Sequence, residues 1–450
     1  MSVEQQYLDL YMQHGNLLRE HSVPVLNVQR EKAFRAFERQ GFPTRKVEKY
    51  RYTDISRLFE PDYGMNLRRV GISVNPYDVF RGSVPQLSTS PYFVVNDNLF
   101  QPVGGHKPCP EGVIVSSFSN LSKDHQALIS AYYGRIAEVE TDGLTAFNSA
   151  FVQDGLLVYV SKNVVLDHPL QLINLMRADY DMLVNRRVLV ILESGAQLKL
   201  LACDHSMQGA RTLSTQVIEV FVGENASFDF YELEETTSDH VRISQLYVHQ
   251  DTGSKVLLNG MTLMGGVTRN TVSVKLAGEG ATLHAYGMAI EDGRQVVDNQ
   301  VYVEHAVPHC SSDQLFKYVL DEEAVGAFAG LVKVQPGAHH TESRQTNRNL
   351  CATREAHMYT QPQLEIYNDD VKCSHGATVG QLDEQALFYM RQRGIALHEA
   401  RLLLMFAFVD DVVQAVRLDS LRDRLRQLVE LRFRSELGKG CSGCNICKKN

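Results

Sequence analysis

The sequence predicts a mainly β fold, in which a long run of short strands is flanked by α-helical segments at both ends. Apolar residues recur at helical spacing before about residue 60 and again after about residue 380. Between about 155 and 375, short apolar segments alternate with Gly, Asn and Asp, which is typical of strands joined by turns. Within that stretch a weak repeat recurs about every 27–30 residues, a period typical of solenoids.

The first part of the chain, residues 1–60, is predicted to be helical. Leu8, Tyr11, Ala33 and Phe37 recur at helical spacing, and Gly41 ends the pattern. Residues 61–154 contain many Pro, Gly, Asn and Ser, so we expect an irregular mixed segment that leads into the core.

The repeat defines the predicted core, residues 155–378. Four of its segments begin at Gly195, Asn225, Gly253 and Gly280. In each, a turn residue is followed by a small residue and then by apolar residues two and four positions further on. A β-solenoid buries the apolar face of each rung against its neighbours, which this pattern would achieve. A β-sandwich with regular turns is the alternative.

The chain is expected to become helical again over residues 379–437. Asp383 is placed to cap a first helix, and Gly394 fits the C-terminus of that helix. A second helix is predicted over 397–416, and a third begins near Asp419 with leucines on one face. The remaining residues, 438–450, are rich in Gly, Lys and Cys and are predicted to form a flexible tail.

Composition and motifs exclude several classes of function. The net charge is -8 and no basic stripe stands out, so we expect no nucleic-acid partner. No apolar run reaches the roughly 18–20 residues of a membrane span, and the N-terminus lacks a basic leader, which predicts a cytoplasmic location. The phosphate-loop, HExxH and GxSxG motifs are absent from the sequence, so ATP hydrolysis by this chain itself is not expected.

Two groups of residues could hold iron or another metal. Cys373 and His375 stand two apart, so on a strand they would share a face, and thiolate and imidazole suit iron and iron–sulfur clusters. A buried cysteine beside a hydrogen-bonded histidine is the alternative. Cys441, Cys444 and Cys447 could bind one metal with a fourth ligand from elsewhere, or could be a reduced tail without metal. The adjacent His339 and His340 would point apart on a strand, so a shared metal is not expected there.

Several longer motifs resemble the SufB/SufD family of the SUF iron–sulfur cluster assembly system. They are Lys46–Thr53 (KVEKYRYT), Pro362–Ile366 (PQLEI), Asp370–Thr378 (DVKCSHGAT), Leu387–Tyr389 (LFY) and Arg393–Ile395 (RGI). The resemblance covers most of the chain, is weakest over about 60–140 and does not extend to the cysteine tail. It implies a right-handed parallel β-helix core between helical N- and C-terminal parts.

The resemblance also implies partners. A SufB-type subunit would pair through the edge of the β-helix, and a homodimer could form when partners are missing. The C-terminal helices would hold a SufC-type ABC ATPase, with Arg393, Gly394, Leu403 and Phe406 as docking residues. The chain would then be a non-catalytic scaffold that shares a transient iron–sulfur cluster with its partner.

Within the family, the motif around His375 is closer to the SufD form than to the SufB form. SufB-like chains carry a cysteine where Asn347 stands here and a glutamate where Gly376 stands here. The resemblance implies that His375 lies at the SufB–SufD interface. Lys372 should raise the local positive charge and so favour a thiolate at Cys373 or on the SufB-type partner. Asp369 and Asp370 are expected to orient the His375 ring.

Alternative functions are kept open. Because Cys351 lies near Asn347, a SufB-like role as the main cluster builder is one alternative. From a different class, a carbohydrate-active enzyme on a β-helix could use acidic pairs such as Asp369–Asp370 or Glu322–Glu323. An electron-transfer protein built on the tail cysteines is a third alternative.

Overall fold

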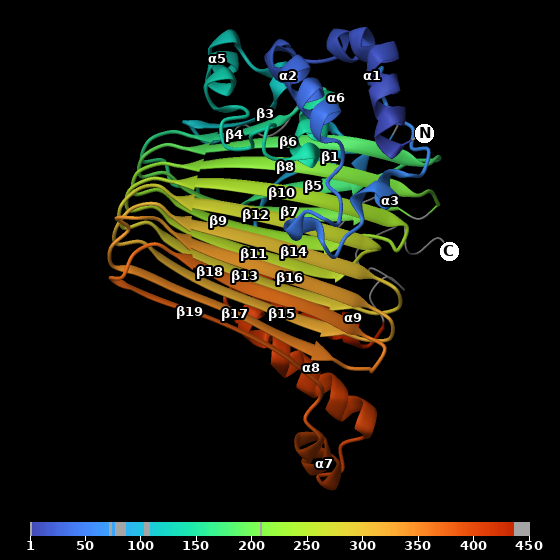
Figure 1. Cartoon of the computed structure of the whole chain (residues 1–450), viewed down its shortest axis with the longest axis vertical. Coiled ribbons are helices and arrows are strands. Elements are labelled where there is room, and N and C mark those ends of the chain that lie inside the picture. Colours follow the sequence, from blue (N-terminus) through green and yellow to red (C-terminus); the bar gives the residue numbers. More distant parts are fainter. Residues whose placement is uncertain (1, 72–73, 77–86, 103–108, 208, 436–450) are drawn as a thin grey trace.

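A computed structural model describes residues 2–71, 74–76, 87–102, 109–207 and 209–435. The centre of the molecule is a parallel β-solenoid made of two long sheets, one of ten strands and one of nine (Figure 1). The predicted solenoid is therefore confirmed, and the sandwich alternative is wrong. The tail cysteines Cys441, Cys444 and Cys447 lie outside the described residues.

Successive strands along the chain alternate between the two sheets. The ten-stranded sheet consists, from its first edge, of β2 (Asn98–Leu99), β1 (Ser90–Val95), β5 (Leu170–Met176), β7 (Gln197–Ser206), β9 (Ser227–Glu235), β11 (Lys255–Met264), β13 (Thr282–Glu291), β15 (Ser311–Leu320), β17 (Thr341–Cys351) and β19 (Val371–Gly380). The nine-stranded sheet consists of β3 (Val113–Ser117), β4 (Leu156–Val160), β6 (Met182–Leu192), β8 (Thr212–Val222), β10 (His240–Gln250), β12 (Val267–Leu276), β14 (Val296–His305), β16 (Val325–Val334) and β18 (His357–Ile366). Only the β1–β2 and β3–β4 pairs are antiparallel among the described strands.

One corner of the solenoid is built from residues in the left-handed backbone region. Its successive rungs place there Gly195, Asn225, Gly253, Gly280, His309 and His340. Each donates its N–H to a carbonyl of the next rung; Asn225 bonds Thr252 at 2.8 Å and Gly253 bonds Glu279 at 2.9 Å. The first four are the residues at which the sequence repeat begins, so the repeat marks the turns that stack the rungs.

Apolar side chains stack in register inside the solenoid. In the nine-stranded sheet one inward column consists of Val190, Val220, Val248, Val274, Val303 and Val332. In the ten-stranded sheet an inward column begins with Leu198, Phe228, Val256 and Leu283 and continues as Ser312, Ser343 and Cys373. The interior is therefore apolar over the early rungs and gains small polar side chains toward the last ones.

The N-terminal helices lie over the first rungs of the solenoid (Figure 1). They are α1 (Val3–Glu20), α2 (Pro24–Gln40), α3 (Ile55–Phe59), α5 (Lys123–Tyr132) and α6 (Gly143–Phe151), with the short 3-10 helix η2 (Phe118–Asn120). A second 3-10 helix, η1 (Glu48–Tyr50), contacts later strands of the nine-stranded sheet. As predicted, α2 ends before Gly41, which has a positive φ of 64°.

The segment 61–154 is more ordered than the sequence predicts. It holds strands β1 and β3 and the helices α5 and α6, and every residue of α6 is buried. Asp142 caps α6 by accepting from the N–H groups of Leu144 and Thr145 at 2.9 and 3.4 Å. Helix α6 has only nine residues, fewer than the roughly 11–18 over which helical periodicity is recognised, so its pattern is easily missed in the sequence.

The C-terminal helices follow the prediction closely. They are α7 (Glu384–Gln392), α8 (Leu397–Gln414) and α9 (Asp419–Phe433), with Asp383 capping α7 and Gly394 at a φ of 85° after it. Helices α8 and α9 pack on the outer face of the ten-stranded sheet, where Met405 and Val409 share an apolar cluster with Leu257. Helix α7 lies beyond the last rung (Figure 1). In the described part of the chain, every helix is too short or too polar to span a membrane.

The five-part division of the chain, at residues 60, 154, 378 and 437, stays a prediction. The described strands β4 to β19 run from Leu156 to Gly380, and the C-terminal helices run from Glu384 to Phe433.

Replacing Gly253 with Ala should weaken the stacking of the rungs. The new Cβ would strain the positive φ of 64° and clash with Asn225 Oδ1 of the preceding rung. We expect a loss of about 1–3 kcal/mol in the free energy of unfolding, measured by urea denaturation. Gly71→Ala is the control, because a Cβ there meets open space, and it should change stability by less than about 0.5 kcal/mol. Equal stability of the two variants would contradict the role assigned to this corner.

Candidate functional site

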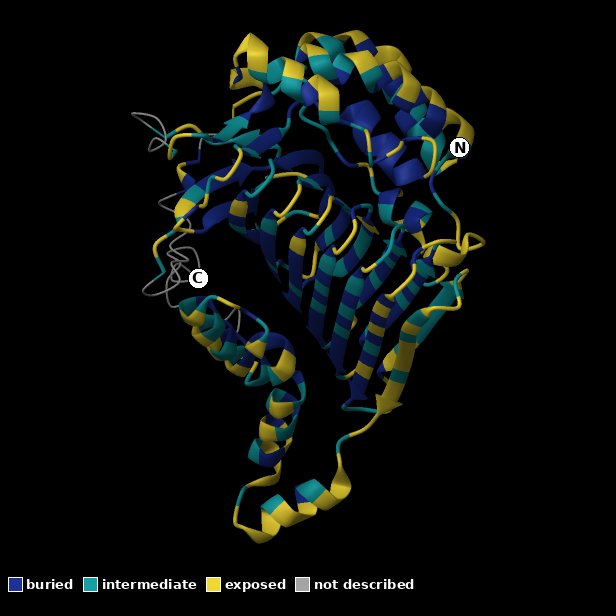
Figure 2. Cartoon of the chain, turned by 90° about the vertical axis from the view of Figure 1, so that its left-hand side faces the viewer, coloured by how far each residue is buried: buried dark blue, intermediate teal, exposed yellow. Residues whose placement is uncertain are grey.

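The two ends of the solenoid differ. The first rungs are covered by the N-terminal helices, whereas β18 and β19 form the last edge of each sheet and have no further strand partner among the described residues (Figure 1). Figure 2 shows that the last strands are much more exposed than the strands before them. Four large apolar side chains are exposed on this rung, namely Tyr359 (46%), Ile366 (40%), Tyr367 (56%) and Val379 (50%). We call this last rung, residues 357–380, the open end.

Cys373 and His375 both lie on β19, at the open end. They stand opposite Ser343 and Gln345 of β17, and the alternation along the strand places them on the same face, as the sequence predicts. Cys373 is half-buried against the cluster of Val332, Val334 and Ala338, and burial raises the pKa of its thiol. His375 is exposed.

Polar side chains line the interior beneath His375. The inward column of the ten-stranded sheet reads Leu200, Phe230, Leu258 and Ala285 in the early rungs and then changes to Gln314, Gln345 and His375. Gln314 and Gln345 are buried and hydrogen-bond to each other at 3.0 Å. Gln314 Nε2 and Gln345 Oε1 have no hydrogen-bond partner among the described residues. This part of the interior therefore has an unused donor and an unused acceptor.

Asn347, at the position where SufB-like chains are expected to carry a cysteine, is fully buried. Its Oδ1 accepts from Asn349 Nδ2 at 2.6 Å and from Thr360 Oγ1 at 2.7 Å, and its Nδ2 donates to the Phe316 carbonyl at 3.2 Å. This side chain therefore links β17 to β18 and β15.

Two expectations around His375, a favoured thiolate at Cys373 and orientation of the ring by Asp370, are wrong, whereas the roles expected of Lys372 toward a partner thiol and of Asp369 stay predictions. The Lys372 ammonium contacts Glu342 Oε1 at 3.0 Å on the outward face, while the pKa of Cys373 is raised by burial instead of lowered. The Asp370 carboxylate lies 3.1 Å from His340 Nδ1, so it is engaged at the turn instead of orienting the His375 ring. His340 in turn stacks on His309, with ring centroids 4.7 Å apart.

The open end supplies too few ligands for a metal site of its own. Among the described residues, no three His, Cys, Asp or Glu side chains are grouped so that they could hold a metal ion. Cys373 and His375 offer one sulfur and one nitrogen ligand, whereas iron–sulfur clusters take four protein ligands in ordinary sites. A cluster at this end would therefore need ligands beyond those that the described residues group there.

A buried charge network that the sequence analysis missed lies deeper in the solenoid. Asp204 accepts from Arg186 and Arg242, each at 3.1 Å, and Arg242 also pairs with Glu232. Arg242 lies 4.0 Å from Glu234, and desolvation raises the pKa of Glu234 to about 7 despite that charge. The alternation of these strands could have placed the residues inside, but charged residues are ordinarily assigned to the outer face.

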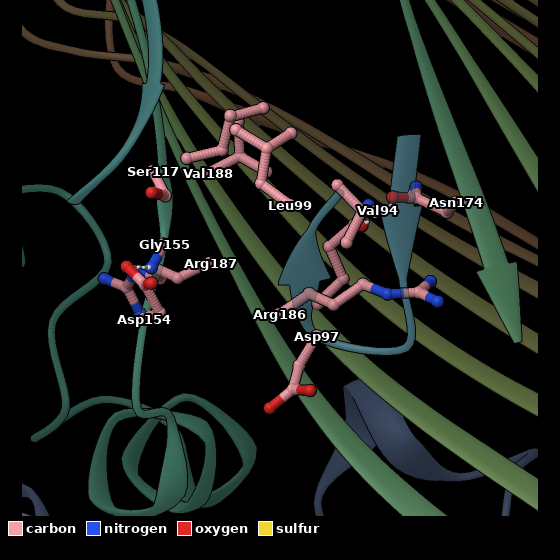
Figure 3. Close-up of a pocket in the computed structure, with 12 residues that line it drawn as sticks. Val94, Asp97, Leu99, Ser117, Asp154, Gly155, Asn174, Arg186, Arg187 and Val188 are labelled. Carbon is pink, nitrogen blue, oxygen red and sulfur yellow. Dashed lines mark hydrogen bonds between the residues drawn. The ribbon is translucent and has the colours of Figure 1, made fainter. Parts of the chain in front are cut away.

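A small cavity adjoins this network at the first end of the solenoid. It measures about 20 Å³ and is lined by Arg186, Asp97 and Asn174, among others (Figure 3). A cavity of that volume can hold about one water molecule. The cavity is too small for a substrate, so it does not compete with the open end as a functional site.

The C-terminal helices carry a second candidate surface. A pocket of about 180 Å³ between α8 and α9 is lined by Leu402, Leu403, Phe406 and Phe433, with Glu399, Glu430 and Arg434 at its charged part. Leu403 is 43% exposed, whereas Phe406 is partly buried. Arg393 and Gly394 lie apart from this pocket, at the exposed corner between α7 and α8.

Comparison with known proteins gives matches along almost the whole chain. The profile of the SufBD protein N-terminal region matches residues 1–172, and that of the SUF system FeS cluster assembly, SufBD core domain, matches residues 175–408. An iron–sulfur cluster assembly SufBD family protein of Synechocystis is 29% identical over 402 residues, covering 87% of each chain. The iron–sulfur cluster assembly protein SufD of Escherichia coli is 28% identical over 86% of this chain and 88% of its own. SufD of Bacillus subtilis is 25% identical over 71% of this chain and 74% of its own.

The raised pKa of Glu234 makes stability depend on pH. Because the folded pKa of about 7 exceeds the ordinary value of 4.5, the folded chain holds a proton that the unfolded chain releases between these pH values. The contribution of Glu234 to the free energy of unfolding is therefore fully present below about pH 4.5 and falls as pH rises to about 7. Urea denaturation at several pH values between 5 and 7 measures how the free energy of unfolding changes with pH. This free energy should fall with rising pH in the wild type and fall less steeply in Glu234→Gln. The same pH dependence in both proteins would contradict the raised pKa of Glu234.

Proposed function

This chain belongs to the SufBD family of iron–sulfur cluster assembly subunits, and we propose that it acts as a SufD-type scaffold that pairs with a SufB-type partner. The observation that carries the proposal is the open end, where two strand edges and four exposed apolar side chains lie together. An uncovered strand edge is a template for pairing with another chain. A second β-solenoid with an equivalent edge could continue both sheets.

We propose that the iron–sulfur cluster is cargo held between the two subunits. His375 would supply an imidazole from this chain, with the Cys373 thiol as a further ligand, and the partner would complete the set. His375 is favoured over Cys373, since it is exposed while Cys373 is half-buried with a raised pKa.

A SufB-like role as the main cluster builder has less support. Asn347 carries no thiol and is buried within a hydrogen-bond network. The nearby Cys351 is buried at the end of β17, and burial raises the pKa of its thiol, which disfavours the reactive thiolate.

The carbohydrate-active alternative has no supporting observation at the acidic pairs. Glu323 forms an ion pair with Arg294 at 3.0 Å, and Glu322 accepts from the Gly293 N–H at 2.9 Å. Asp370 is paired with His340. These carboxylates are engaged in turns of the solenoid, so a non-catalytic role remains the proposal.

We further propose that α7 to α9 hold a SufC-type ATPase. The pocket between α8 and α9 offers an apolar floor next to charged groups, where Arg434 is bonded to Glu399 at 2.9 and 3.1 Å. Arg393 and Gly394 would add contacts from the α7–α8 corner. Homodimer formation without the SufB-type partner, a cytoplasmic location and metal binding by the tail cysteines stay predictions.

His375→Ala should lower the iron and sulfide content of the complex purified with the SufB-type partner, because it removes the exposed imidazole ligand. Since the side chain is exposed, the fold and the binding of the partner should be retained. The measurement is iron and acid-labile sulfide per mole of the partner, after anaerobic purification.

His357→Ala is the matched control for that experiment, since His357 is exposed on β18 of the same rung. It should leave the cluster content unchanged. Asn347→Ala is unsuitable as a control, because it would remove the acceptor of the Thr360 hydroxyl and one of the two acceptors of Asn349 Nδ2. If His375→Ala carries as much cluster as wild type, the cluster ligands lie wholly in the partner.

Leu403→Asp should weaken binding of the SufC-type ATPase by at least about tenfold, because it places a charge at the rim of an apolar pocket. Since Leu403 is 43% exposed, the fold should survive, and circular dichroism checks this. Met12→Asp, an exposed apolar position on α1, is the control and should bind like wild type. Binding is measured by titration calorimetry; unchanged affinity in Leu403→Asp would remove this pocket from the docking surface.

A further inference from the structure

The segment of residues 46–53, which we call the strap, contains the KVEKYRYT motif that the sequence analysis singled out. It lies between α2 and α3 and includes the short helix η1. Its contacts cross the outer face of the nine-stranded sheet, from Arg269 on β12 through Asp298 on β14 to Tyr359 on β18. The strap therefore connects the N-terminal part of the chain to the edge strand of the open end.

One set of contacts anchors the strap to the body of the solenoid. The Tyr50 ring is fully buried, its hydroxyl donates to Asp142 at 2.6 Å, and the Arg269 guanidinium lies 4.1 Å from the ring centroid. Arg269 also bonds the Asp298 carboxylate, to which Thr53 Oγ1 donates at 2.5 Å. This end of the strap is fixed by buried, charge-assisted hydrogen bonds.

A second set of contacts reaches the edge strand β18. Glu48 Oε1 accepts from Gln361 Nε2 at 2.8 Å and from Gln363 Nε2 at 2.9 Å. The Tyr52 ring stacks on Tyr359, with centroids 4.7 Å apart and planes 17° from parallel. Tyr359, Gln361 and Gln363 alternate along β18 and so share its outward face, which means that the strap holds this strand along much of its length.

An edge strand needs such support more than an inner strand does. Among the described strands, β18 has a ladder partner on one side only, β16, and edge elements open locally at lower free energy than the core. Pairing with another chain requires a straight strand in one register, since a one-residue shift would exchange its two faces. Contacts on the outward face restrain β18 without occupying its free edge.

We propose that the strap holds β18 in the conformation that pairs with a partner β-solenoid, so that Glu48 and Tyr52 are positioning residues for the partner interface. The identity of the partner rests on the proposed function, whereas the restraint on β18 exists in the free chain. Val47, which precedes Glu48 in the strap, is exposed and adds apolar surface to it.

The restraint is tested first on the free chain by hydrogen–deuterium exchange. In Glu48→Ala and Tyr52→Ala, amides of residues 357–366 should exchange about 5- to 20-fold faster than in wild type. Amides in the middle of the solenoid, such as residues 212–222, should be unchanged. The conservative variants Glu48→Gln and Tyr52→Phe, which keep an acceptor and a ring, should stay within about 2-fold of wild type.

Matched controls lie at the other end of the molecule. Glu31→Ala removes an exposed carboxylate that pairs with Arg19 and Arg35, and Tyr132→Ala removes a ring that packs on Phe221. Neither should alter exchange in residues 357–366. If the two strap variants exchange like these controls, the strap does not restrain β18 and the proposal is overturned.

Binding of a purified SufB-type subunit is then measured for the same set of variants. Glu48→Ala and Tyr52→Ala should weaken the affinity about tenfold, and the controls and conservative variants should bind like wild type. If wild type itself fails to bind, the proposed pairing fails, while the exchange result still decides the restraint. If wild type and the strap variants bind equally despite faster exchange, the strap restrains β18 but does not position it for a partner.

Discussion

The constraint on which the structure depends is that each rung of a solenoid buries its inner face only against the rungs before and after it. The turn residues that stack at one corner, from Gly195 to His340, keep successive rungs in register. The same constraint leaves the final rung with one neighbour. An open end with unpaired edges and exposed apolar side chains therefore follows from the architecture itself, unless another element covers it.

The first and the last rung of the solenoid differ in how their outer sides are covered. At the first end, antiparallel strands and the buried helix α6 complete the packing within the chain. At the last end, the strap supports the outward face of β18, and the edges of β18 and β19 have no further strand partner among the described residues. The described chain thus completes its packing at the first end and leaves strand edges open at the last, where the candidate site lies.

Much of this organisation could be predicted from the sequence, because its signals are local. Left-handed turn residues are restricted to Gly, Asn and a few others, so the repeat starting at Gly195, Asn225, Gly253 and Gly280 marked the rungs. Asp383 marked the start of α7, because a side-chain acceptor is preferred at the residue before the first helical turn. What could not be predicted depends on distant pairs. Glu48 and Gln363 are 315 residues apart, and neither residue carries a local signal of the other.

Asn347 shows why a cysteine ligand cannot be introduced beneath the open end by a single substitution without disturbing its neighbours. Asn347 is the shared acceptor of Asn349 on its own strand β17 and of Thr360 on β18, so it links the strand next to one edge to the strand that forms the other edge. A cysteine there would be a weak acceptor, so the part-buried Thr360 hydroxyl would lose its partner and Asn349 Nδ2 would keep only its bond to the Thr378 carbonyl, at a cost of up to about 1–3 kcal/mol for the buried amide. The thiol would also be buried beneath the rung that carries His375, where desolvation disfavours the thiolate. A cluster-building thiol at this position would therefore require a rearranged interior as well as a new side chain. In the present arrangement the same position stabilises the open end, and Cys373 and His375, the candidate ligands at this end, lie on the exposed rung above it.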